Sequence, residues 1–333
     1  MRAIFLCENA EHVFHVYDEQ TVRALQARLS MKKRVYAKAE ILEEPSRFAN
    51  VEFIFSTWGM PVFDEAEIKT CFPSLRCVFY GAGTVQKFAR PFLRCGVKVF
   101  SAWAANAVPV AEMTVAQIVL ANKGYFLSNR LYHSVGNDAA KAAIKGCNGN
   151  YGEAVGIIGA GMIGKLVIEM LKAYRLRVLV FDPFLPDQKA AELGVEKCSL
   201  DEIFTRAFAV SNHLANNEQT KGMLCYKYFR KMRECAVFIN TGRGAQVIED
   251  DLVRILMERP DLTALLDVTH PEPPAEGHPF YTLPNCLLTP HIAGSGGDEV
   301  ARMGEYMLRE FEAYASEMPT RYEVTEKMLE TMA

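Results

Sequence analysis

The sequence lacks the features that mark disulfide-stabilised and metal-binding proteins. Its nine cysteines are an odd number and form no Cys-x-x-Cys pair, which argues against a disulfide framework. Its seven histidines show no metal-site spacing with cysteines or carboxylates, so no metal is expected. Several cysteines lie in or beside apolar runs, where a reduced thiol behaves as a small core residue. We therefore predict a reducing compartment, the cytoplasm.

A strong charge of one sign is also absent. The 37 basic and 40 acidic residues leave a formal net charge of −3, and the basic residues are scattered. Neither nucleic acid nor a membrane is therefore an expected partner. We find no apolar run that approaches the length of a membrane span. The stretch 1–10 is too short for a signal peptide and predicts a first strand.

What is present is a repeated alternation of strand-like and helix-like segments. A chain of 333 residues that is 50% hydrophobic predicts two domains. In the first part we predict strands at 3–7, 51–56, 76–80 and 97–100, with helices at 19–29 and 64–69. In the second we predict a helix at 104–121 and strands at 154–158, 178–181, 207–212, 236–240, 263–268 and 286–289. The fold class is α/β with doubly wound parallel sheets.

The predicted domain border lies near 101–106. A substrate domain covers 1–101 and is completed by 296–333, and a nucleotide domain covers 102–295. Residues 122–150 have little hydrophobic periodicity, and 141–150 is interpreted as a loop. Residues 298–314 predict a helix that returns to the first domain, and the polar tail after Met318 is expected to fray.

The stretch 153–182 organises the second half of the chain. An apolar strand leads into Gly159, Gly161 and Gly164, an amphipathic helix follows, and a second strand ends in Asp182. This is the dinucleotide-binding fingerprint in its full context. Gly159 permits the tight exit from the strand, Gly161 lets the backbone approach a pyrophosphate, and Gly164 lets the helix pack closely on the sheet.

Asp182 indicates which dinucleotide is bound. Its carboxylate would accept hydrogen bonds from the adenosine ribose hydroxyls and would repel a 2′-phosphate. Pro183 and Phe184 follow, so no arginine is present to bind that phosphate. We predict NAD as the cofactor.

Three further strand ends carry residues suited to carbonyl chemistry. Arg243 can grip a carboxylate with two hydrogen bonds while it polarises the adjacent carbonyl. His291 can exchange a proton with the substrate oxygen. Glu272, if paired with His291, would favour the imidazolium and hold its orientation. Each residue alone has an ordinary structural explanation, but together at one sheet edge they predict a catalytic set.

Other candidates stay open beside this set. His270 and His278 lie in a proline-rich loop and rank below His291, and His213 could border the adenine side of the cofactor. The loop 80–84 could bind a small anion through its amides or be an ordinary glycine turn. Trp58 could wall a substrate pocket or simply pack.

These motifs together resemble the D-isomer-specific 2-hydroxyacid dehydrogenases. The resemblance covers roughly residues 75–296 and rests on ordered motifs: GAG at 81–83, AVPVAE at 107–112, VGIIGAGMIG at 155–164, FDP at 181–183, HLANNEQTKG at 213–222, VFINTGRGAQVIEDDLV at 237–253, DVTHPEPP at 267–274 and TPHIAGS at 289–295. It implies a Rossmann-type domain, a second flavodoxin-like α/β domain, an active site between them, and a homodimer through the nucleotide domain.

The resemblance also assigns roles to residues. Arg243 matches the substrate-binding arginine, His291 the acid/base histidine and Glu272 its partner. Ala82 and Gly83 match the loop that holds the substrate carboxylate, with Trp58 added as a pocket candidate. The cofactor-binding set is Gly159, Gly161, Met162, Ile163, Gly164, Asp182, His213, Thr220, Thr241, Gly242, Asp267, Gly294 and Thr114, of which Thr241 and Asp267 are expected on the nicotinamide side.

Two positions depart from the family pattern. Thr84 stands where many members have Asp, and Asn216-Asn217 replaces Pro-Leu, so the hinge loop and the adenine pocket are expected to differ.

The leading functional hypothesis is NAD(H)-dependent interconversion of a 2-oxo acid and its D-2-hydroxy acid. The alternatives are a non-catalytic NAD(H)-sensing protein similar to corepressors of this fold, and a dehydrogenase for another substrate such as a phosphonate or formate. With Glu272 present, formate is disfavoured.

Overall fold

The computed structural model describes residues 1–330 and divides the chain into two compact units. One unit comprises Met1–Asn106 and the segment that begins at Ser295, and the other comprises Ala107–Gly294. The last three residues of the predicted 296–333 segment lie outside the described residues. Each unit is described by itself below.

The first unit is built on a six-stranded sheet in the order β13-β5-β4-β3-β1-β2. Strands β1 to β5 are parallel, and β13 pairs antiparallel with β5. The parallel order 2-1-3-4-5 is that of the flavodoxin-like fold, which confirms the predicted fold class. The strands are β1 (Ala3–Leu6), β2 (Val35–Tyr36), β3 (Phe53–Ser56), β4 (Cys77–Tyr80), β5 (Lys98–Ser101) and β13 (Glu323–Val324).

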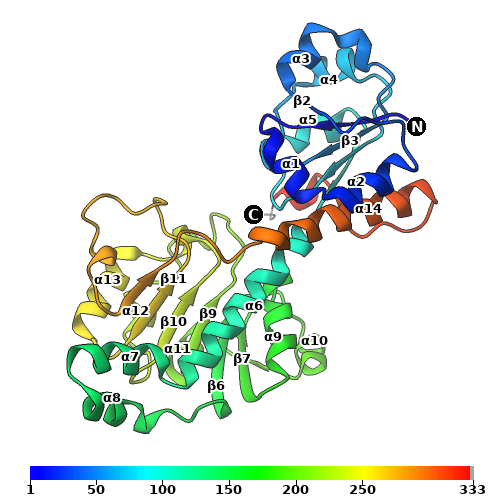
Figure 1. Cartoon of the computed structure of the whole chain (residues 1–333). Coiled ribbons are helices and arrows are strands. Elements are labelled where there is room, and N and C mark those ends of the chain that lie inside the picture. The colour runs from blue at the N-terminus through cyan, green and yellow to red at the C-terminus, as the bar shows by residue number, and fades with distance from the viewer. Residues whose placement is uncertain (331–333) are drawn as a thin grey trace. The chain divides into compact units, whose positions relative to one another are not determined.

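Helices cover both faces of this sheet (Figure 1). Along β1 the side chains alternate: Phe5 belongs to the core with α1, α2 and α14, and Leu6 to the core with α3, α4 and α5. Strands buried on both faces must be apolar throughout, as these are. The helices are α1 (Ala10–Val16), α2 (Glu19–Gln26), α3 (Lys38–Glu43), α4 (Glu65–Cys71), α5 (Ala89–Arg94) and α14 (Ala301–Ala315).

The second unit contains a seven-stranded parallel sheet in the order β12-β11-β10-β9-β6-β7-β8. The chain starts in the middle at β6, moves to one side and then returns to the other, which is the Rossmann order. The strands are β6 (Tyr151–Ile158), β7 (Arg175–Phe181), β8 (Glu196–Lys197), β9 (Ala209–Asn212), β10 (Val237–Asn240), β11 (Thr263–Leu266) and β12 (Cys286–Leu288).

Helices again cover both faces of the second sheet. One core contains α11, α12 and α13, and the opposite core contains α9, α10 and part of α6 (Trp103–Asn122). The helices of this unit are α7 (Tyr125–Ser134), α8 (Asn137–Ala143), α9 (Met162–Leu171), α10 (Asp187–Leu193), α11 (Leu200–Arg206), α12 (Tyr226–Phe229) and α13 (Glu249–Glu258).

We expected no apolar run that approaches the length of a membrane span, and helix α6 (Trp103–Asn122) shows that this was wrong. By length and composition alone it could cross a membrane, and half of its most apolar window is buried. Its apolar residues have packing partners, because Ala105 lies in a core of the first unit, and Ala111 and Ile118 lie in a core of the second. Core helices meet the same criteria, so packing accounts for its composition.

Two other expectations were wrong. The predicted loop 141–150 begins inside α8 and continues into a 3-10 turn at Ile144–Gly146. Within the described residues up to Glu330, the tail after Met318 does not fray, because β13 extends the first sheet and Val324 is buried in its core. Both segments carry too few apolar residues for periodicity to reveal them.

A buried ion pair stabilises the start of β6. Glu153 is 1% exposed, and its carboxylate accepts hydrogen bonds from the Arg233 guanidinium (2.6 Å), the Asn148 amide (2.8 Å) and the Ala154 N–H (2.8 Å). Burial by itself raises the pKa of Glu153, but these hydrogen bonds and the Arg233 charge outweigh it and hold the pKa below its ordinary value.

Replacing Glu153 with Gln should lower the free energy of unfolding by about 2–3 kcal/mol at pH 7, because Arg233 loses its counter-charge while it remains partly buried. A carboxylate whose pKa is lower in the folded than in the unfolded state stabilises the folded protein at any pH above its unfolded pKa. This contribution is lost as the pH falls through the folded pKa. The difference in the free energy of unfolding between wild type and E153Q, measured by urea denaturation, should therefore be constant down to about pH 4.3 and shrink below it. Glu192→Gln, which alters an exposed ion pair, is the control, and an equal effect of both substitutions would contradict the prediction.

Candidate active site

The glycine turn after β6 has the geometry that the fingerprint predicts. Gly159 has a φ of 93°, and a Cβ atom there would lie 2.6 Å from the carbonyl oxygen of His213. A Cβ on Gly164 would lie 2.0 Å from the carbonyl oxygen of Gly159. A Cβ on Gly161, in contrast, would meet no atom within 4 Å. Two glycines are required for packing, and the third faces open space.

That open space lies at the N-terminus of α9. Gly161 is the N-cap residue and has no side chain to satisfy the first amides of the helix. Met162 is 46% exposed and Ile163 is half-buried. Free amides and the positive end of a ten-residue helix favour an anion. The arrangement therefore fits a pyrophosphate group.

Asp182 lies beside the same turn. One of its carboxylate oxygens accepts a hydrogen bond from the Ala160 N–H at 2.8 Å, and the other accepts one from the Phe184 N–H at 2.8 Å. Each oxygen keeps a lone pair for a further donor. The carboxylate thus joins the two loops and leaves capacity for ribose hydroxyls, as predicted for an NAD site.

His213 is less accessible than expected for an adenine contact. It is 8% exposed, its Nε2 lies 3.0 Å from the Ser211 hydroxyl, and its buried Nδ1 has no hydrogen-bond partner within residues 1–330. Burial lowers the pKa of His213 to about 4, so the ring is neutral at neutral pH. The backbone of His213, rather than its ring, packs against Gly159.

The remaining predicted cofactor residues belong to the second unit, and three of them are buried threonines. The buried hydroxyls of Thr114 and Thr241 lie 3.0 Å apart, which ties α6 to the end of β10. Thr220 is also buried, and its hydroxyl donates to the Ala215 carbonyl. Gly294 is the last residue of this unit.

A buried amide network, which sequence reasoning missed, holds the loop that follows β10. The Asn212 side-chain amide donates to the Asn240 side chain (3.0 Å) and to Gln246 (2.6 Å). Asn240 accepts from the Gly242 N–H (3.1 Å) and donates to the Arg243 carbonyl (3.2 Å). Asn212 and Asn240 are paired across neighbouring strands, so an asparagine ending each of two apolar runs was the available signal.

This network presents Arg243 at the carboxyl end of β10. Its guanidinium is partly buried and donates to the Gly242 carbonyl at 2.8 Å. Burial lowers the pKa of Arg243, and the nearby Glu272 carboxylate opposes that effect. An arginine remains charged at neutral pH under such conditions. Arg243 and Glu272 are thus close enough to interact.

Asp267 anchors the loop that carries His291. The Asp267 carboxylate accepts hydrogen bonds from the Thr289 hydroxyl (2.6 Å) and from the N–H groups of Ile292 (2.8 Å) and Ala293 (2.9 Å). Its backbone carbonyl accepts the His291 N–H at 3.0 Å. Asp267 is 2% exposed, so this carboxylate holds the loop from the protein interior. Its predicted contact with the nicotinamide stays a prediction.

The anchored loop brings His291 and Glu272 together. The His291 Nδ1 lies 2.6 Å from a Glu272 carboxylate oxygen, and both side chains are partly exposed. His291 has a φ of 53°, a left-handed conformation that is uncommon for a residue other than glycine and is often found at functional sites. The second ring nitrogen, Nε2, has no hydrogen-bond partner within the described chain, so it is available to a substrate.

A cavity of about 400 Å³ adjoins this pair. Its walls are mostly apolar, and the residues that line it are Asp267, Thr269, Glu272, Pro273, Pro274, Tyr281, Leu288, Thr289, Pro290 and His291.

The competing histidines are held differently. The His270 N–H donates to the Glu249 carboxylate (2.7 Å), and the His278 ring accepts the Phe280 N–H (3.2 Å). His291 remains the best candidate for acid/base chemistry.

In the first unit, the loop after β4 has the features of an anion-binding turn. The carbonyls of Ala82 and Gly83 accept hydrogen bonds from the Ser101 hydroxyl, and the Gly81 carbonyl accepts one from Thr57 (2.8 Å). The N–H groups of Ala82 and Gly83 donate to no protein acceptor within residues 1–330. The loop is therefore held by its carbonyls and leaves its amides available.

The two remaining positions in this unit are more exposed. Trp58 is 38% exposed, and its carbonyl accepts a hydrogen bond from the Cys7 thiol at 3.0 Å. Its ring is thus not a core residue, which favours a pocket or surface role over plain packing. Thr84, the departure from the family pattern, is exposed.

Comparison with known proteins identifies the nucleotide unit. Residues 128–293 match the NAD binding domain of the D-isomer specific 2-hydroxyacid dehydrogenases. The YoaD protein of Bacillus subtilis, provisionally named a 2-hydroxyacid dehydrogenase, is 35% identical over 205 residues, which are 60% of this chain and 58% of YoaD. The human glyoxylate reductase/hydroxypyruvate reductase is 37% identical over 142 residues, or 42% of this chain and 43% of the human protein.

The chain spans about half the length of the curated relatives it matches. Among solved structures, a phosphoglycerate oxidoreductase from Rhizobium etli has a TM-score of 0.79 at 20% identity and covers 98% of this chain and 99% of its own. This similarity supports the two-unit fold. The relatives are named as dehydrogenases and reductases, so they give no support to the corepressor alternative.

The contrast between two glycines provides a test of the cofactor site. Gly161→Ala should leave the melting temperature near wild type, because its Cβ meets no protein atom, yet weaken NADH binding at least about tenfold, because that Cβ occupies the space of the pyrophosphate. Gly164→Ala should lower the melting temperature, because its Cβ would collide with the Gly159 carbonyl. NADH fluorescence titration and thermal unfolding measure the two effects, and unchanged NADH affinity in folded G161A would refute the assignment.

Proposed function

We propose that this chain, whose residues 128–293 match the NAD binding domain of the D-isomer specific 2-hydroxyacid dehydrogenases, uses NAD(H) to interconvert a 2-oxo acid and the corresponding D-2-hydroxy acid. The observation that carries this proposal is the Glu272–His291 pair, with its 2.6 Å contact at a strand end near Arg243. A paired histidine and a partly buried arginine are the groups that this reaction needs.

Arg243 has two tasks in the proposed reaction. Its guanidinium binds the substrate carboxylate through two parallel hydrogen bonds and draws electron density from the adjacent carbonyl. Partial burial strengthens both interactions, because little water competes for the guanidinium. The buried amide network of Asn212, Asn240 and Gln246 holds the loop in place, so Arg243 needs little reorganisation when substrate binds.

His291 moves the proton. Its Nδ1 faces the Glu272 carboxylate, so Nε2 is the nitrogen that donates to the carbonyl oxygen during reduction and accepts the proton back during oxidation. The Glu272 carboxylate fixes the ring orientation through its contact with Nδ1. NADH, when bound, supplies the hydride. Asp267 keeps the His291 loop in its strained conformation throughout.

The Ala82–Gly83 loop of the first unit is also proposed to bind a carboxylate. Its two amides are available, and the Ser101 hydroxyl orients their peptide groups. Backbone N–H groups bind a carboxylate without adding positive charge. The D configuration of the hydroxy acid follows from the family and forms part of the proposal.

Replacing Arg243 with Ala should cost about 3–5 kcal/mol of transition-state binding, because a desolvated ion pair with the carboxylate is lost. The measurement is kcat/KM for NADH oxidation with the best substrate from a panel of 2-oxo acids. The exposed Arg230→Ala is the matched control in the same unit. Near-wild-type turnover by R243A would exclude this role.

Replacing His291 with Gln should preserve NADH affinity and reduce kcat by about 10²–10⁴-fold, because the proton donor is removed while the cofactor site is untouched. His270→Gln is the control, since the His270 contact to Glu249 is made by the backbone N–H. If wild type binds NADH but reduces no member of the 2-oxo acid panel, the proposed reaction is wrong and a sensing role gains support.

A further inference from the structure

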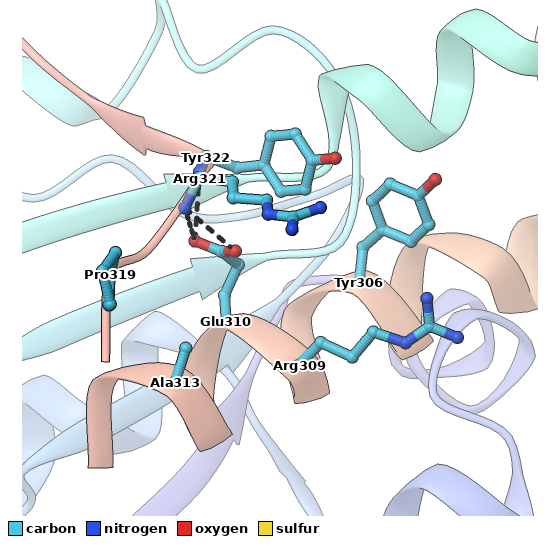
Figure 2. A pocket seen from close by; sticks show the side chains of 7 residues that line it. All are labelled: Tyr306, Arg309, Glu310, Ala313, Pro319, Arg321 and Tyr322. Carbon is cyan, nitrogen blue, oxygen red and sulfur yellow. Dashed lines mark hydrogen bonds between the residues drawn. The ribbon is translucent and has the colours of Figure 1, made fainter. Parts of the chain in front are cut away.

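The first unit contains a second cavity that the proposed reaction does not use. It has a volume of about 360 Å³, within the range of small-molecule sites, and lies between α14 and the segment before β13. Figure 2 shows Tyr306 and Arg309 extending from α14, and Arg321 and Tyr322 extending from the neighbouring segment. The residues that line it are Tyr306, Arg309, Glu310, Ala313, Pro319, Arg321 and Tyr322.

Aromatic rings and guanidiniums are combined in this cavity. The rings of Tyr306 and Tyr322 are stacked with centroids 5.4 Å apart, and the Arg309 guanidinium lies 5.9 Å from the Tyr306 ring centroid. Trp103 packs edge-on against Tyr322 at 5.6 Å. These contacts hold the Tyr322 ring rigidly, so its hydroxyl can be a fixed hydrogen-bond donor.

The Tyr322 hydroxyl lies within the electrostatic reach of both arginines. Burial raises the pKa of Tyr322, Tyr306 and Glu310 act in the same direction, and Arg321 and Arg309 oppose them. The phenol therefore stays protonated at neutral pH and can donate to an anion. Arg309 and Arg321 line the same cavity as Tyr322.

Arg321 supplies a charge that has no ion-pair partner among residues 1–330. Arg309 is paired with Glu305 on its own helix at 3.3 Å. In the described chain no carboxylate lies within ion-pair distance of the Arg321 guanidinium. An exposed, unpaired guanidinium beside a cavity can form two parallel hydrogen bonds to a carboxylate or phosphate.

Among the described residues, Glu310 is the one acidic residue that lines the cavity, and its carboxylate is already engaged. Glu310 is 4% exposed, and its carboxylate accepts the N–H groups of Arg321 (3.0 Å) and Tyr322 (3.0 Å). Figure 2 shows this carboxylate turned toward the backbone of that segment. Glu310 therefore fixes the two residues that face the cavity and reduces, without cancelling, its positive charge.

We propose that this cavity is a binding site for a small oxyanion, a carboxylate or a phosphate group, held by Arg321, Arg309 and the Tyr322 hydroxyl. The site is separate from the Arg243 and His291 chemistry, lies entirely within the first unit, and does not depend on the proposed reaction. A ligand there would stiffen the contact between α14 and the segment before β13.

Calorimetric titration of the full chain tests the site with two probes, inorganic phosphate and malonate, at constant ionic strength. Saturating NADH and an Arg243→Gln background remove competing binding at the cofactor and substrate sites. We expect saturable binding of at least one probe, weakened about tenfold or more by Arg321→Gln, because a charged bidentate contact is lost. Tyr322→Phe should weaken it by a smaller factor.

Arg23→Gln is the matched control, since Arg23 is an exposed arginine of the same unit that lies outside the cavity and pairs with Glu19. It should leave binding unchanged, and Arg321→Gln should leave NADH affinity unchanged. Preference for one probe would show whether the site suits phosphates or carboxylates. Absence of saturable binding below about 10 mM, or equal affinities in wild type, R321Q and R23Q, would overturn the proposal.

Discussion

The arrangement of the candidate active site depends on the buried carboxylate of Asp267. It accepts three hydrogen bonds from the loop 289–293, and its own backbone carbonyl accepts a fourth, from the His291 N–H. This holds His291 in a left-handed conformation that an unrestrained loop would leave. The ring then meets Glu272 through Nδ1 and leaves Nε2 available. Without Asp267, two partly exposed side chains on separate loops would have little reason to stay paired.

The cofactor turn depends on a second constraint, the close approach of backbone to backbone. Gly159 packs against His213, and Gly164 packs against the Gly159 carbonyl, at distances that no side chain tolerates. Gly161 alone is free of such contacts. The same loop therefore shows which glycines serve the fold and which serves a ligand. The buried amide network after β10 also restricts a loop, because side-chain amides whose hydrogen bonds are satisfied hold the Arg243 loop rigidly.

Much of the fold was readable from the sequence because parallel strands buried on both faces must be apolar. The strands that carry the candidate site were therefore visible as short runs that end in polar residues. The tail after Met318 was misread, since β13 contributes two residues and gains its stability from pairing with β5. Helix α6 was predicted at 104–121 and is confirmed at Trp103–Asn122, but its apolar residues were not expected to serve two different cores.

The sequence by itself determined the two α/β sheets, the dinucleotide turn, the preference of Asp182 for NAD and the identity of Arg243, Glu272 and His291 as candidates. These follow from local rules: strand periodicity, glycine spacing and the chemistry that follows each strand. Only the tertiary structure decided that His291 pairs with Glu272, that Asp267 holds their loop, and that Arg321 stands beside a cavity with no ion-pair partner in the described part of the chain. Such facts depend on distances between residues far apart in the chain, and those distances exist only once the sheets have brought the strand ends together.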